Sequence, residues 1–299
     1  MEQAAAHRRT DGEHKGTLYV VATPIGNLSD ISLRALEVLK KVDVVAAEDT
    51  RVSSRLLQRY GITAKLVALH EHNEARATAP LLALLAQGKS LALVSDAGTP
   101  GISDPGARLT AAAREAGYRI SPVPGANAAV AALSVSGIAA PHFLFYGFLP
   151  SRAAERGKEL SALAAYPFPL VFFEAPHRIL ESVGDMALTL GGARRIVIAR
   201  ELTKMFESIH SCTLSEANAW LEKDGARRKG EFVLVVEGAG DERAGDDEVQ
   251  RTLEVLLAAV PLKQAVTLAT RITGAQRNRV YALALALKSG APHASEKQR

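Results

Sequence analysis

The chain has 299 residues, of which 47% are apolar and 23% charged, and its 36 basic and 32 acidic side chains give a formal net charge of +4. This length and composition allow one large core or two ordinary ones, which excludes a globally disordered protein. The longest apolar runs, such as LYVVAT and FVLVV, are much shorter than the roughly 20 residues that cross a bilayer. We therefore expect a cytoplasmic protein with no transmembrane helix. A charge of +4 is compatible with an anionic partner but does not by itself indicate nucleic acid.

The amino-terminal segment, residues 1–16, is polar and lacks the apolar stretch of a secretory signal. We expect it to be a disordered leader. The single cysteine, Cys212, has no second cysteine with which to form an intramolecular disulfide or a zinc cluster, so we expect it to be a half-buried small side chain.

From Gly16 onward, short β-branched runs alternate with amphipathic stretches. This alternation predicts an α/β protein with a mostly parallel first sheet and helices on both of its faces. We assign these elements to an amino-terminal domain over residues 17–137. Its five predicted strands are residues 18–23, 42–49, 65–70, 90–98 and 119–124.

A break at residues 137–141 is followed by a second α/β domain, which we place at 138–240. Its connections are sometimes too short for a crossover helix, above all between ARELTK and MFESIH, so we expect a mixed, partly antiparallel sheet. A charged, glycine-containing linker is predicted at 238–248, followed by a small helical module at 249–288. The five predicted strands of the second domain are residues 143–150, 169–175, 194–203, 205–214 and 230–238.

Three loops follow strands of the first domain and combine glycine, proline and small polar residues: 23–30, 95–106 and 122–130. Ligands of open parallel sheets bind beyond the carboxyl ends of the strands, so these loops should line one cleft. The first loop could owe its composition to an ordinary strand-to-helix turn. The second, SDAGTPGISDPG, holds more glycine and aspartate than a turn requires.

Familiar nucleotide motifs are missing from these loops, since neither GxGxxG nor GxxxxGK[ST] occurs at the strand ends. The segment VSDAGTP is similar to the start of a haloacid dehalogenase phosphatase, but that chemistry needs two carboxylates one residue apart. Ser95 and Ala97 flank Asp96, which leaves too few oxygen ligands for Mg²⁺. We therefore expect no metal site.

Six segments together resemble one family: TPIGNLSDI, AEDTR, SDAGTPGISDPG, PGANAAVAALSVSG, FFEAPHRI and ARELTKMFE. The chain resembles, over roughly residues 17–285, the bacterial small-subunit ribosomal RNA 2′-O-cytidine methyltransferases of the tetrapyrrole-methylase-like group. The resemblance implies a two-domain α/β fold, S-adenosylmethionine as cofactor in the cleft between domains, and a homodimer. It also implies ribosomal RNA as partner. We expect this RNA to lie in the 30S subunit, with free RNA as the open alternative, and we expect no membrane partner.

The resemblance places the methyl donor on the second loop, and the residue types there suit it. Two glycines permit a close approach of the backbone, and Asp96 can accept hydrogen bonds. By resemblance alone, the segments around Phe173 and Glu174, around Leu202, and at residues 230–232 are expected to meet the adenine. The predicted cofactor-binding residues are Pro24, Asp96, Gly98, Thr99, Gly101, Ile102, Ala126, Asn127 and Leu202.

Methyl transfer to a ribose hydroxyl needs a nearby base, or a cation that stabilises the developing alkoxide. We predict Lys204, Glu201 and Glu174 as catalytic residues that act on this hydroxyl or its neighbours. The positive side chains near the same strand ends would bind an anionic substrate. These predicted substrate-binding residues are Arg51, His177, Arg178 and Arg200.

Each of these groups also has a purely structural interpretation. Asp49, next to Arg51, could be an ordinary helix cap. His177 could sit in the first turn of a helix, and Arg200 could form an ion pair with Glu201.

The carboxyl-terminal segment from Leu262 to Lys288 has five basic residues and no acidic one. Its pattern predicts two short helices joined by a glycine turn. We expect Lys263, Arg271, Arg277 and Arg279 to bind RNA, although the pair could instead pack or dimerise. This basic extension favours an RNA substrate over the main alternative, a tetrapyrrole (precorrin-type) methylase that uses the same donor cleft. A non-catalytic RNA-binding protein is disfavoured because the donor loops keep their polar and glycine positions.

Overall fold

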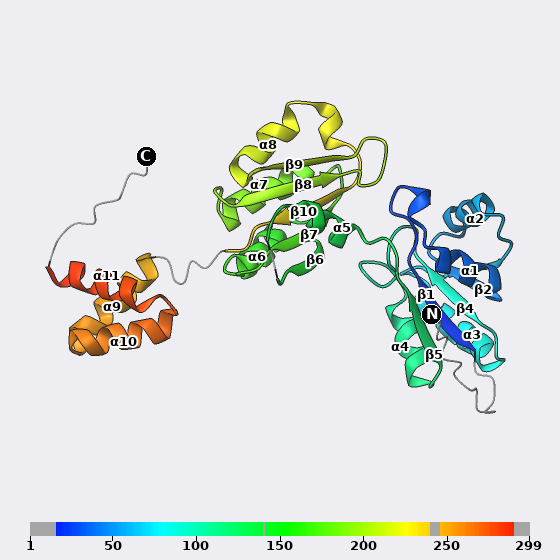
Figure 1. Cartoon of the computed structure of the whole chain (residues 1–299), viewed down its shortest axis with the longest axis horizontal. Helices are drawn as coiled ribbons and strands as arrows, with labels where there is room; N and C mark the ends of the chain where they lie inside the picture. The colour runs from blue at the N-terminus through cyan, green and yellow to red at the C-terminus, as the bar shows by residue number, and fades with distance from the viewer. Residues whose placement is uncertain (1–15, 140, 240–245, 290–299) are drawn as a thin grey trace, which may run out of the picture.

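The computed structural model describes residues 16–139, 141–239 and 246–289. Figure 1 shows three bodies in chain order: a sheet with its helices, a second sheet with its helices, and a group of three helices near the C-terminus. The predicted leader lies, apart from Gly16, outside the described residues, as do residues 240–245 of the predicted linker. No helix among the described residues is both long enough and apolar enough to cross a membrane.

The first sheet has five strands in the order β3-β2-β4-β1-β5, and every pair is parallel. The sequence prediction of five strands in a parallel first sheet is confirmed. The strands are Thr17–Val21 (β1), Val44–Ala47 (β2), Lys65–Ala68 (β3), Leu91–Val94 (β4) and Arg119–Val123 (β5). The helical segments between and after them are Leu28–Asp30 (η1), Leu33–Lys41 (α1), Thr50–Arg59 (α2), Glu74–Ala86 (α3), Ala107–Glu115 (α4) and Ala128–Val135 (α5).

Both faces of this sheet are buried. All four residues of β2 and of β4 are inaccessible to solvent, which explains why these strands are continuous apolar runs rather than alternating ones. One face packs against α1 and α2 through Leu39 and Leu57, and the other packs against α3 and α4 through Leu81 and Leu109.

The second sheet is mixed, with the order β6-β7-β10-β8-β9. Strands β6 and β7 are parallel, while the other three pairs are antiparallel, including β8 with β9, as the short connection predicts. The strands are Leu144–Phe148 (β6), Leu170–Glu174 (β7), Arg195–Arg200 (β8), Ser208–Thr213 (β9) and Phe232–Val236 (β10). The accompanying helices are Ala153–Leu163 (α6), Ile179–Leu190 (α7), Leu214–Glu222 (α8) and Gly225–Arg228 (η2).

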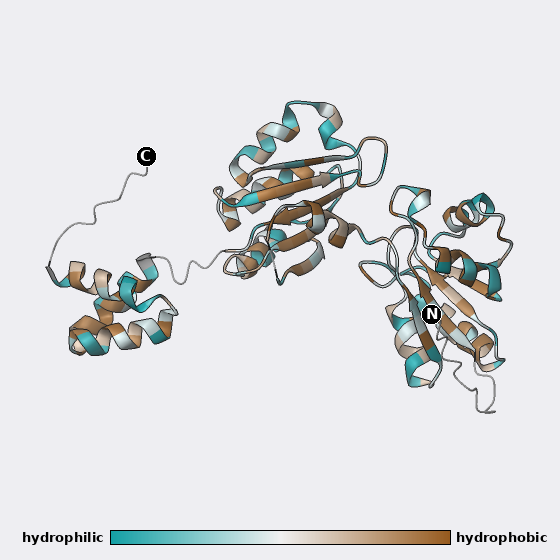
Figure 2. Ribbon diagram, viewed as in Figure 1, coloured by the Kyte–Doolittle hydropathy of each residue, from teal (hydrophilic) through white to brown (hydrophobic). Residues whose placement is uncertain are grey.

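Helix α5 links the two sheets. It follows β5 in the chain, but Ala129 and Ala132 pack against Val171, Val197 and Val233 of the second sheet. The opposite face of that sheet packs against α6, α7 and α8. Figure 2 shows the strands of both sheets as mainly hydrophobic and the outer helices as mixed, as expected for buried sheets between amphipathic helices. The last helix of the predicted first domain therefore shares the core of the second.

Three helices form the carboxyl-terminal module: Asp246–Ala259 (α9), Leu262–Thr273 (α10) and Arg277–Ser289 (α11). They enclose a core of their own that includes Leu253, Val266 and Val280. Gly274 has a left-handed conformation (φ 67°) and ends α10, so the predicted glycine turn between two helices is confirmed. Helix α9 adds a third helix to the predicted pair.

Candidate active site

A cavity of about 350 Å³ lies between the two α/β domains. The first domain supplies the loops that follow β1 and β4 and the start of α5, while the second supplies the ends of β6 and β7, the segment after β8, and β10. A cavity of this size is typical of small-molecule sites, and its position beyond the carboxyl ends of β1 and β4 is the one expected for an open parallel sheet. The lining residues are Ile25, Ala97, Gly98, Thr99, Ile102, Ser103, Asp104, Asn127, Ala128, Phe148, Phe173, Glu174, Ala175, Pro176, Leu202, Lys204, Glu231, Phe232 and Val233.

The loop after β4 approaches its neighbours closely at Gly98. Gly98 exchanges backbone hydrogen bonds with Thr23, its φ is +81°, and a Cβ atom there would lie 3.4 Å from Ile25 Cγ2. The hydroxyl of Thr99 donates to the carbonyl oxygen of Ala126 at 3.1 Å, which ties this loop to the start of α5. Asn127 caps α5 with its side chain, which accepts from the Val130 backbone N–H. The loop thus presents a fixed backbone surface to the cavity.

Backbone strain is concentrated around the cavity. Among the described residues, three non-glycine residues have a positive φ: Ser103 (62°), Glu201 (52°) and Thr203 (64°). Ser103 lines the cavity, and the other two flank Leu202, which also lines it. Left-handed conformations of this kind persist only where the surrounding structure holds them and are frequent at functional sites.

Lys204 is the central charged group of the second-domain wall. Its Nζ atom lies 2.9 Å from Glu201 Oε1 and 2.6 Å from Glu231 Oε2. Burial acts to lower the pKa of Lys204, but the hydrogen bonds to Glu231 and Glu201 outweigh it, so the pKa lies above its usual value. Burial likewise acts to raise the pKa of Glu201, and its hydrogen bonds with Lys204 and the Glu231 backbone outweigh this effect and lower it. Lys204 is therefore a fixed cation, unsuited to act as a base at neutral pH.

Asp104 is the carboxyl of the first-domain wall with a displaced pKa. Burial raises its pKa from 3.8 to about 6, a hydrogen bond with Ser95 opposes the shift, and the negative charges of Glu48 and Asp96 add to it. This carboxyl titrates close to neutral pH, as groups that transfer protons in enzymes often do.

Glu174 lies at the cavity, but its carboxylate has other partners. The side chain is 1% exposed; Oε1 is 3.3 Å from Arg178 Nε and accepts from the Ala175 backbone N–H, and Oε2 accepts from the Ser182 hydroxyl. Because side chains alternate along a strand, Glu174 points to the face opposite Phe173, toward α7. The expectation that Glu174 acts directly on a ribose hydroxyl is therefore not supported by its orientation.

The structure brings together seven of the predicted cofactor and catalytic residues in the cavity lining: Gly98, Thr99, Ile102, Asn127, Leu202, Lys204 and Glu174. Ala126 and Glu201 do not line the cavity but bind residues that do: the Ala126 carbonyl oxygen accepts from Thr99, and the Glu201 carboxylate accepts from Lys204. Gly101 is absent from the lining. Pro24 and Asp96 line a separate cavity of about 290 Å³ against α2, because the loop turns between residues 96 and 98.

The predicted substrate-binding residues fall into two groups, those that bind other parts of the protein and those that are exposed. Arg178 donates to the carbonyl oxygens of Leu149 and Pro150, and Arg200 donates to those of Phe206 and Lys229. These two guanidinium groups hold loops together through carbonyl oxygens, so substrate binding by Arg178 and Arg200 stays a prediction. The alternative interpretation, an ion pair between Arg200 and Glu201, is not found among the ion pairs of the described residues. Arg51 and His177 are exposed.

Arg51 pairs with Asp49, which lowers the pKa of Asp49 through their hydrogen bonds, and Asp49 is also the N-cap of α2. The capping interpretation of Asp49 is confirmed. Among the basic residues of the carboxyl-terminal module, Lys263, Arg271 and Arg277 are exposed, and Arg279 is half-buried.

Sequence reasoning missed three cavity residues with functional chemistry: Asp104, Glu231 and Phe148. Asp104 is the second aspartate of the loop 95–106, which was already predicted to line the cleft. The presence of two aspartates in that loop could have pointed to it. Glu231 was included only in a segment expected to meet the adenine. Among the residues that the structure describes, no group of three or more His, Cys, Asp or Glu could hold a metal ion.

Known proteins similar to this chain fall into one group. Residues 17–218 match the family model of Tetrapyrrole (Corrin/Porphyrin) Methylases, and residues 243–288 match the RsmI C-terminal HTH domain. The ribosomal RNA small subunit methyltransferase I of Escherichia coli O157:H7 is 50% identical over 281 residues, which cover 93% of this chain and 98% of that protein. The protein of the same name from Pseudomonas aeruginosa is 51% identical over 274 residues, covering 90% and 97%.

Solved structures show the same fold at low sequence identity. The methyltransferase CobJ is 20% identical with a TM-score of 0.58, covering 77% of this chain and 97% of that one. A uroporphyrin-III C-methyl transferase from Thermus thermophilus, solved in complex with S-adenyl homocysteine, is 18% identical with a TM-score of 0.52, covering 76% and 98%. The chain belongs to the tetrapyrrole methylase family and, within it, to the family of the ribosomal RNA small subunit methyltransferase I proteins.

Proposed function

We propose that the chain transfers the methyl group of S-adenosylmethionine to the ribose 2′-hydroxyl of a cytidine in 16S ribosomal RNA of the small subunit. The observation that carries this proposal is the near full-length identity of about 50% to proteins named ribosomal RNA small subunit methyltransferase I. The two solved methyltransferases match over almost their whole length, but they leave about a quarter of this chain unmatched. A carboxyl-terminal module in addition to the methylase fold favours RNA over a precorrin as substrate.

The cavity between the domains has the chemistry that S-adenosylmethionine requires. When bound, this cofactor supplies an activated methyl group on a sulfonium. Ile25, Ile102, Phe173, Leu202 and Val233 offer apolar walls for an adenine ring. The close approach of the backbone at Gly98 offers amide and carbonyl groups for the amino acid part of the donor.

Lys204 is the residue that we assign to the reacting hydroxyl. A fixed cation in a partly dehydrated cavity stabilises the alkoxide that develops as the 2′-hydroxyl releases its proton to solvent water. Glu201 holds Lys204 in place through its 2.9 Å contact, and the Glu201 side chain has room there because Gly230 has no side chain: a Cβ atom on Gly230 would lie 2.5 Å from Glu201 Cγ. Glu174 acts one step further away, by fixing Arg178 and the end of β7.

The carboxyl-terminal module is proposed to dock RNA. The exposed side chains of Lys263, Arg271 and Arg277 lie on α10 and α11, and the segment from Leu262 to Lys288 has no acidic residue. Positive groups of this kind bind phosphates and hold an enzyme in register on its RNA.

The assembled 30S subunit is the proposed substrate, and the chain is proposed to act as a homodimer. Exposed apolar side chains on α5, Val130 at 55% and Val135 at 50%, support a surface that a second copy would cover. Light scattering after size exclusion should give twice the monomer mass of 31.8 kDa. A monomer at micromolar concentration would contradict the homodimer.

The proposed activity can be tested with tritiated S-adenosylmethionine. The protein is incubated separately with unmethylated 30S subunits, with naked 16S ribosomal RNA and with a precorrin. We expect label in RNA, at a phosphodiester bond that resists alkaline hydrolysis because its 2′-oxygen is methylated. Label on the precorrin alone would overturn the proposal, and label at an alkali-sensitive position would place the methyl group on the base.

The role of Lys204 has its own test. Lys204→Ala should reduce kcat by about 100-fold or more while the donor dissociation constant, measured by calorimetry, changes little. Lys204→Arg should retain part of the activity because it keeps the charge. A parallel loss of donor affinity and rate in Lys204→Ala would make Lys204 a cofactor ligand instead.

A further inference from the structure

A third cavity, open and of about 360 Å³, lies beside the donor cavity. It is lined by Pro176, His177, Leu180, Gly225, Arg228 and Lys229, and we call it the basic notch. Pro176 also lines the donor cavity, so the two are direct neighbours. Neither the tetrapyrrole methylase match, which ends at residue 218, nor the match at 243–288 includes Arg228 and Lys229.

The side chains that line the basic notch carry positive charge only. Its lining has two positive side chains and an imidazole, and no acidic residue. His177, Arg228 and Lys229 are all exposed, and none of the three forms an ion pair in the part of the chain that the structure describes. Arg178 and Arg200, in contrast, donate hydrogen bonds to backbone carbonyl oxygens of the protein itself. The notch therefore keeps its donors available for an anion.

The backbone that carries Arg228 and Lys229 is held firmly. Asp224 caps η2 by accepting from the Ala226 N–H at 2.8 Å. Arg227 donates to the Trp220 carbonyl oxygen and lies 4.6 Å from the centre of its ring. Arg200 Nε donates to the Lys229 carbonyl oxygen at 2.7 Å. The backbone of the notch therefore needs little further ordering when a ligand binds, which favours affinity.

The bond from Arg200 also connects the notch to the reacting centre. The same guanidinium donates to the Phe206 carbonyl oxygen at 2.8 Å, in the loop between β8 and β9 that contains Lys204. The backbone of the notch and the segment that contains Lys204 are thus both hydrogen-bonded to the Arg200 side chain. A substrate held in the notch would be in fixed register with the donor cavity.

We propose that the basic notch binds a backbone phosphate of the RNA strand that flanks the target nucleotide. This inference rests on the proposed function and adds a substrate site to it. Arg228 can bind two phosphate oxygens at once, and Lys229 and His177 add further donors. A phosphate fixed beside the donor cavity positions the strand but carries no base specificity.

The test uses the full-length protein with both positive side chains removed, Arg228→Ala/Lys229→Ala. We expect KM for unmethylated 30S subunits to rise roughly tenfold with little change in kcat or in donor affinity. Filter binding of 16S ribosomal RNA across a KCl series gives the slope of the logarithm of the binding constant against the logarithm of the salt concentration. The magnitude of this slope should fall by roughly 1.4, because each of the two lost phosphate contacts accounts for about 0.7. The charge-preserving variant Arg228→Lys/Lys229→Arg should keep the wild-type slope.

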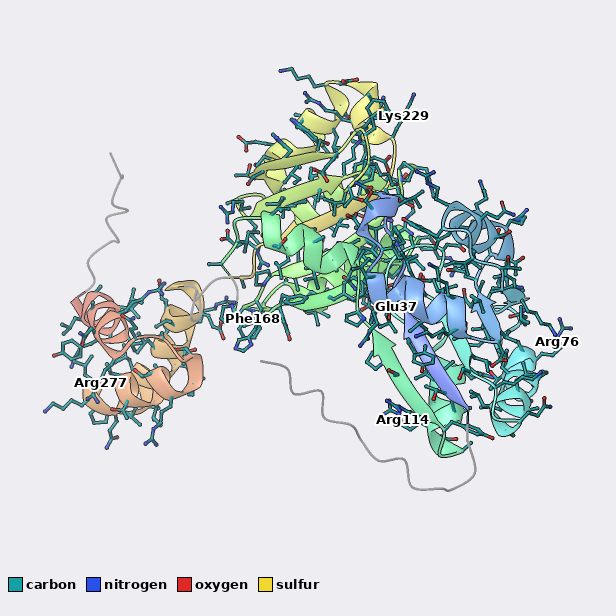
Figure 3. All side chains as sticks on the ribbon, turned by 45° about the vertical axis from the view of Figure 1, so that its right-hand side comes forward. Glu37, Arg76, Arg114, Phe168, Lys229 and Arg277 are labelled. Atoms are coloured by element: carbon teal, nitrogen blue, oxygen red, sulfur yellow. The ribbon has the colours of Figure 1, made fainter. Side chains whose placement is uncertain are left out.

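A matched control removes two charges elsewhere. Arg114→Ala/Arg119→Ala alters exposed residues of α4 and β5. Figure 3 shows Arg114 on the first domain, far from Lys229 on the second. We expect this control to leave KM and the salt slope close to wild type.

The outcomes separate the two proposals. Wild-type methylation of RNA with an unchanged KM and salt slope in Arg228→Ala/Lys229→Ala would overturn the notch and leave the proposed function intact. Equal effects of the notch variant and the control would also overturn it, because they would indicate a general charge effect. A wild-type protein that neither binds nor methylates ribosomal RNA would overturn both.

Discussion

Gly26 of the first domain and Lys204 of the second are in such close contact that a Cβ atom on Gly26 would lie 2.5 Å from Lys204 Cγ. The same atom would lie 2.8 Å from the Leu202 carbonyl oxygen, which cannot move without shifting the backbone. The loop after β1 therefore holds the segment that carries the proposed catalytic lysine. We therefore expect the proposed reacting centre to depend on this contact between domains.

Gly26→Ala tests that dependence. We expect kcat to fall by about tenfold or more, because small displacements of a positioned catalytic group have large effects on rate. Gly157→Ala is the control, since a Cβ atom on Gly157 of α6 meets nothing within 4 Å. Steady-state kinetics of both variants decide the point. Wild-type kcat in Gly26→Ala would show that the contact is not needed for the reaction.

Gly98 and Gly101 allow a matched comparison within one loop. Both have a φ of +81°, so an alanine at either position should cost about 1 kcal/mol of stability. Only at Gly98 would the new Cβ meet neighbours, Ile25 and Ala126. Calorimetry should therefore show weaker donor binding for Gly98→Ala than for Gly101→Ala. Equal donor affinities in the two folded variants would move the donor away from Gly98.

Glu174→Ala should act on stability. Its carboxylate is buried and paired with Arg178, whose side chain is 17% exposed, so its removal leaves a largely buried positive charge without its partner. We expect the free energy of unfolding to fall by about 3 kcal/mol in urea titrations. Glu155→Ala, which breaks an exposed pair with Arg152, should change it by less than about 0.5 kcal/mol. Comparable changes in the two variants would refute a structural role for Glu174.

Asp104 should make stability depend on pH. Its pKa is raised to about 6 in the folded state, so between about pH 4 and 6 the folded protein binds more protons there than the unfolded chain. Stability from this group is therefore present at low pH and is lost as pH rises toward 6. Asp104→Asn should raise the unfolding free energy by about 1 kcal/mol at pH 7 and change it little at pH 4, the effect being reduced by partial exposure.

Urea unfolding of Asp104→Asn and wild type at pH 4, 5, 6 and 7 measures this difference directly. The titration of all other groups is common to both proteins and cancels. A difference that stays constant across the series would mean that Asp104 has an ordinary pKa.

The carboxyl-terminal module can be removed by truncation after about residue 240. Its three helices have their own core, so the α/β domains should still fold and bind S-adenosylmethionine. Methylation of the ribosomal substrate should be lost. The triple variant Lys263→Ala/Arg271→Ala/Arg277→Ala should weaken RNA binding and lower its salt slope by roughly 2. Full activity and an unchanged slope after truncation would exclude the docking role.

Much of the fold could be predicted from the sequence because it depends on local patterns. The apolar runs at residues 44–47 and 91–94 have the length of a strand and are too short for a helix, and both form buried strands. The glycines at 61, 88 and 117 come directly after helices and adopt left-handed conformations, as the sequence predicts for helix ends. The short connection between β8 and β9 left no room for a crossover helix, so their antiparallel pairing followed from chain length. The six motif segments identified the family, which the matches confirm.

Only the tertiary structure decided which residues of those motifs face the cavity. Asp96 and Gly98 are two residues apart, but one lies against α2 and the other against Ile25, because β1 and β4 are adjacent in the sheet while α2 covers one side of the loop. Arg200 was expected at the substrate and instead fastens two loops, because its partners, Phe206 and Lys229, come from segments on either side of it in space. The local pattern of apolar residues indicates whether a segment is a strand or a helix. Which face of that strand, helix or loop meets a second domain depends instead on contacts between residues far apart in the chain.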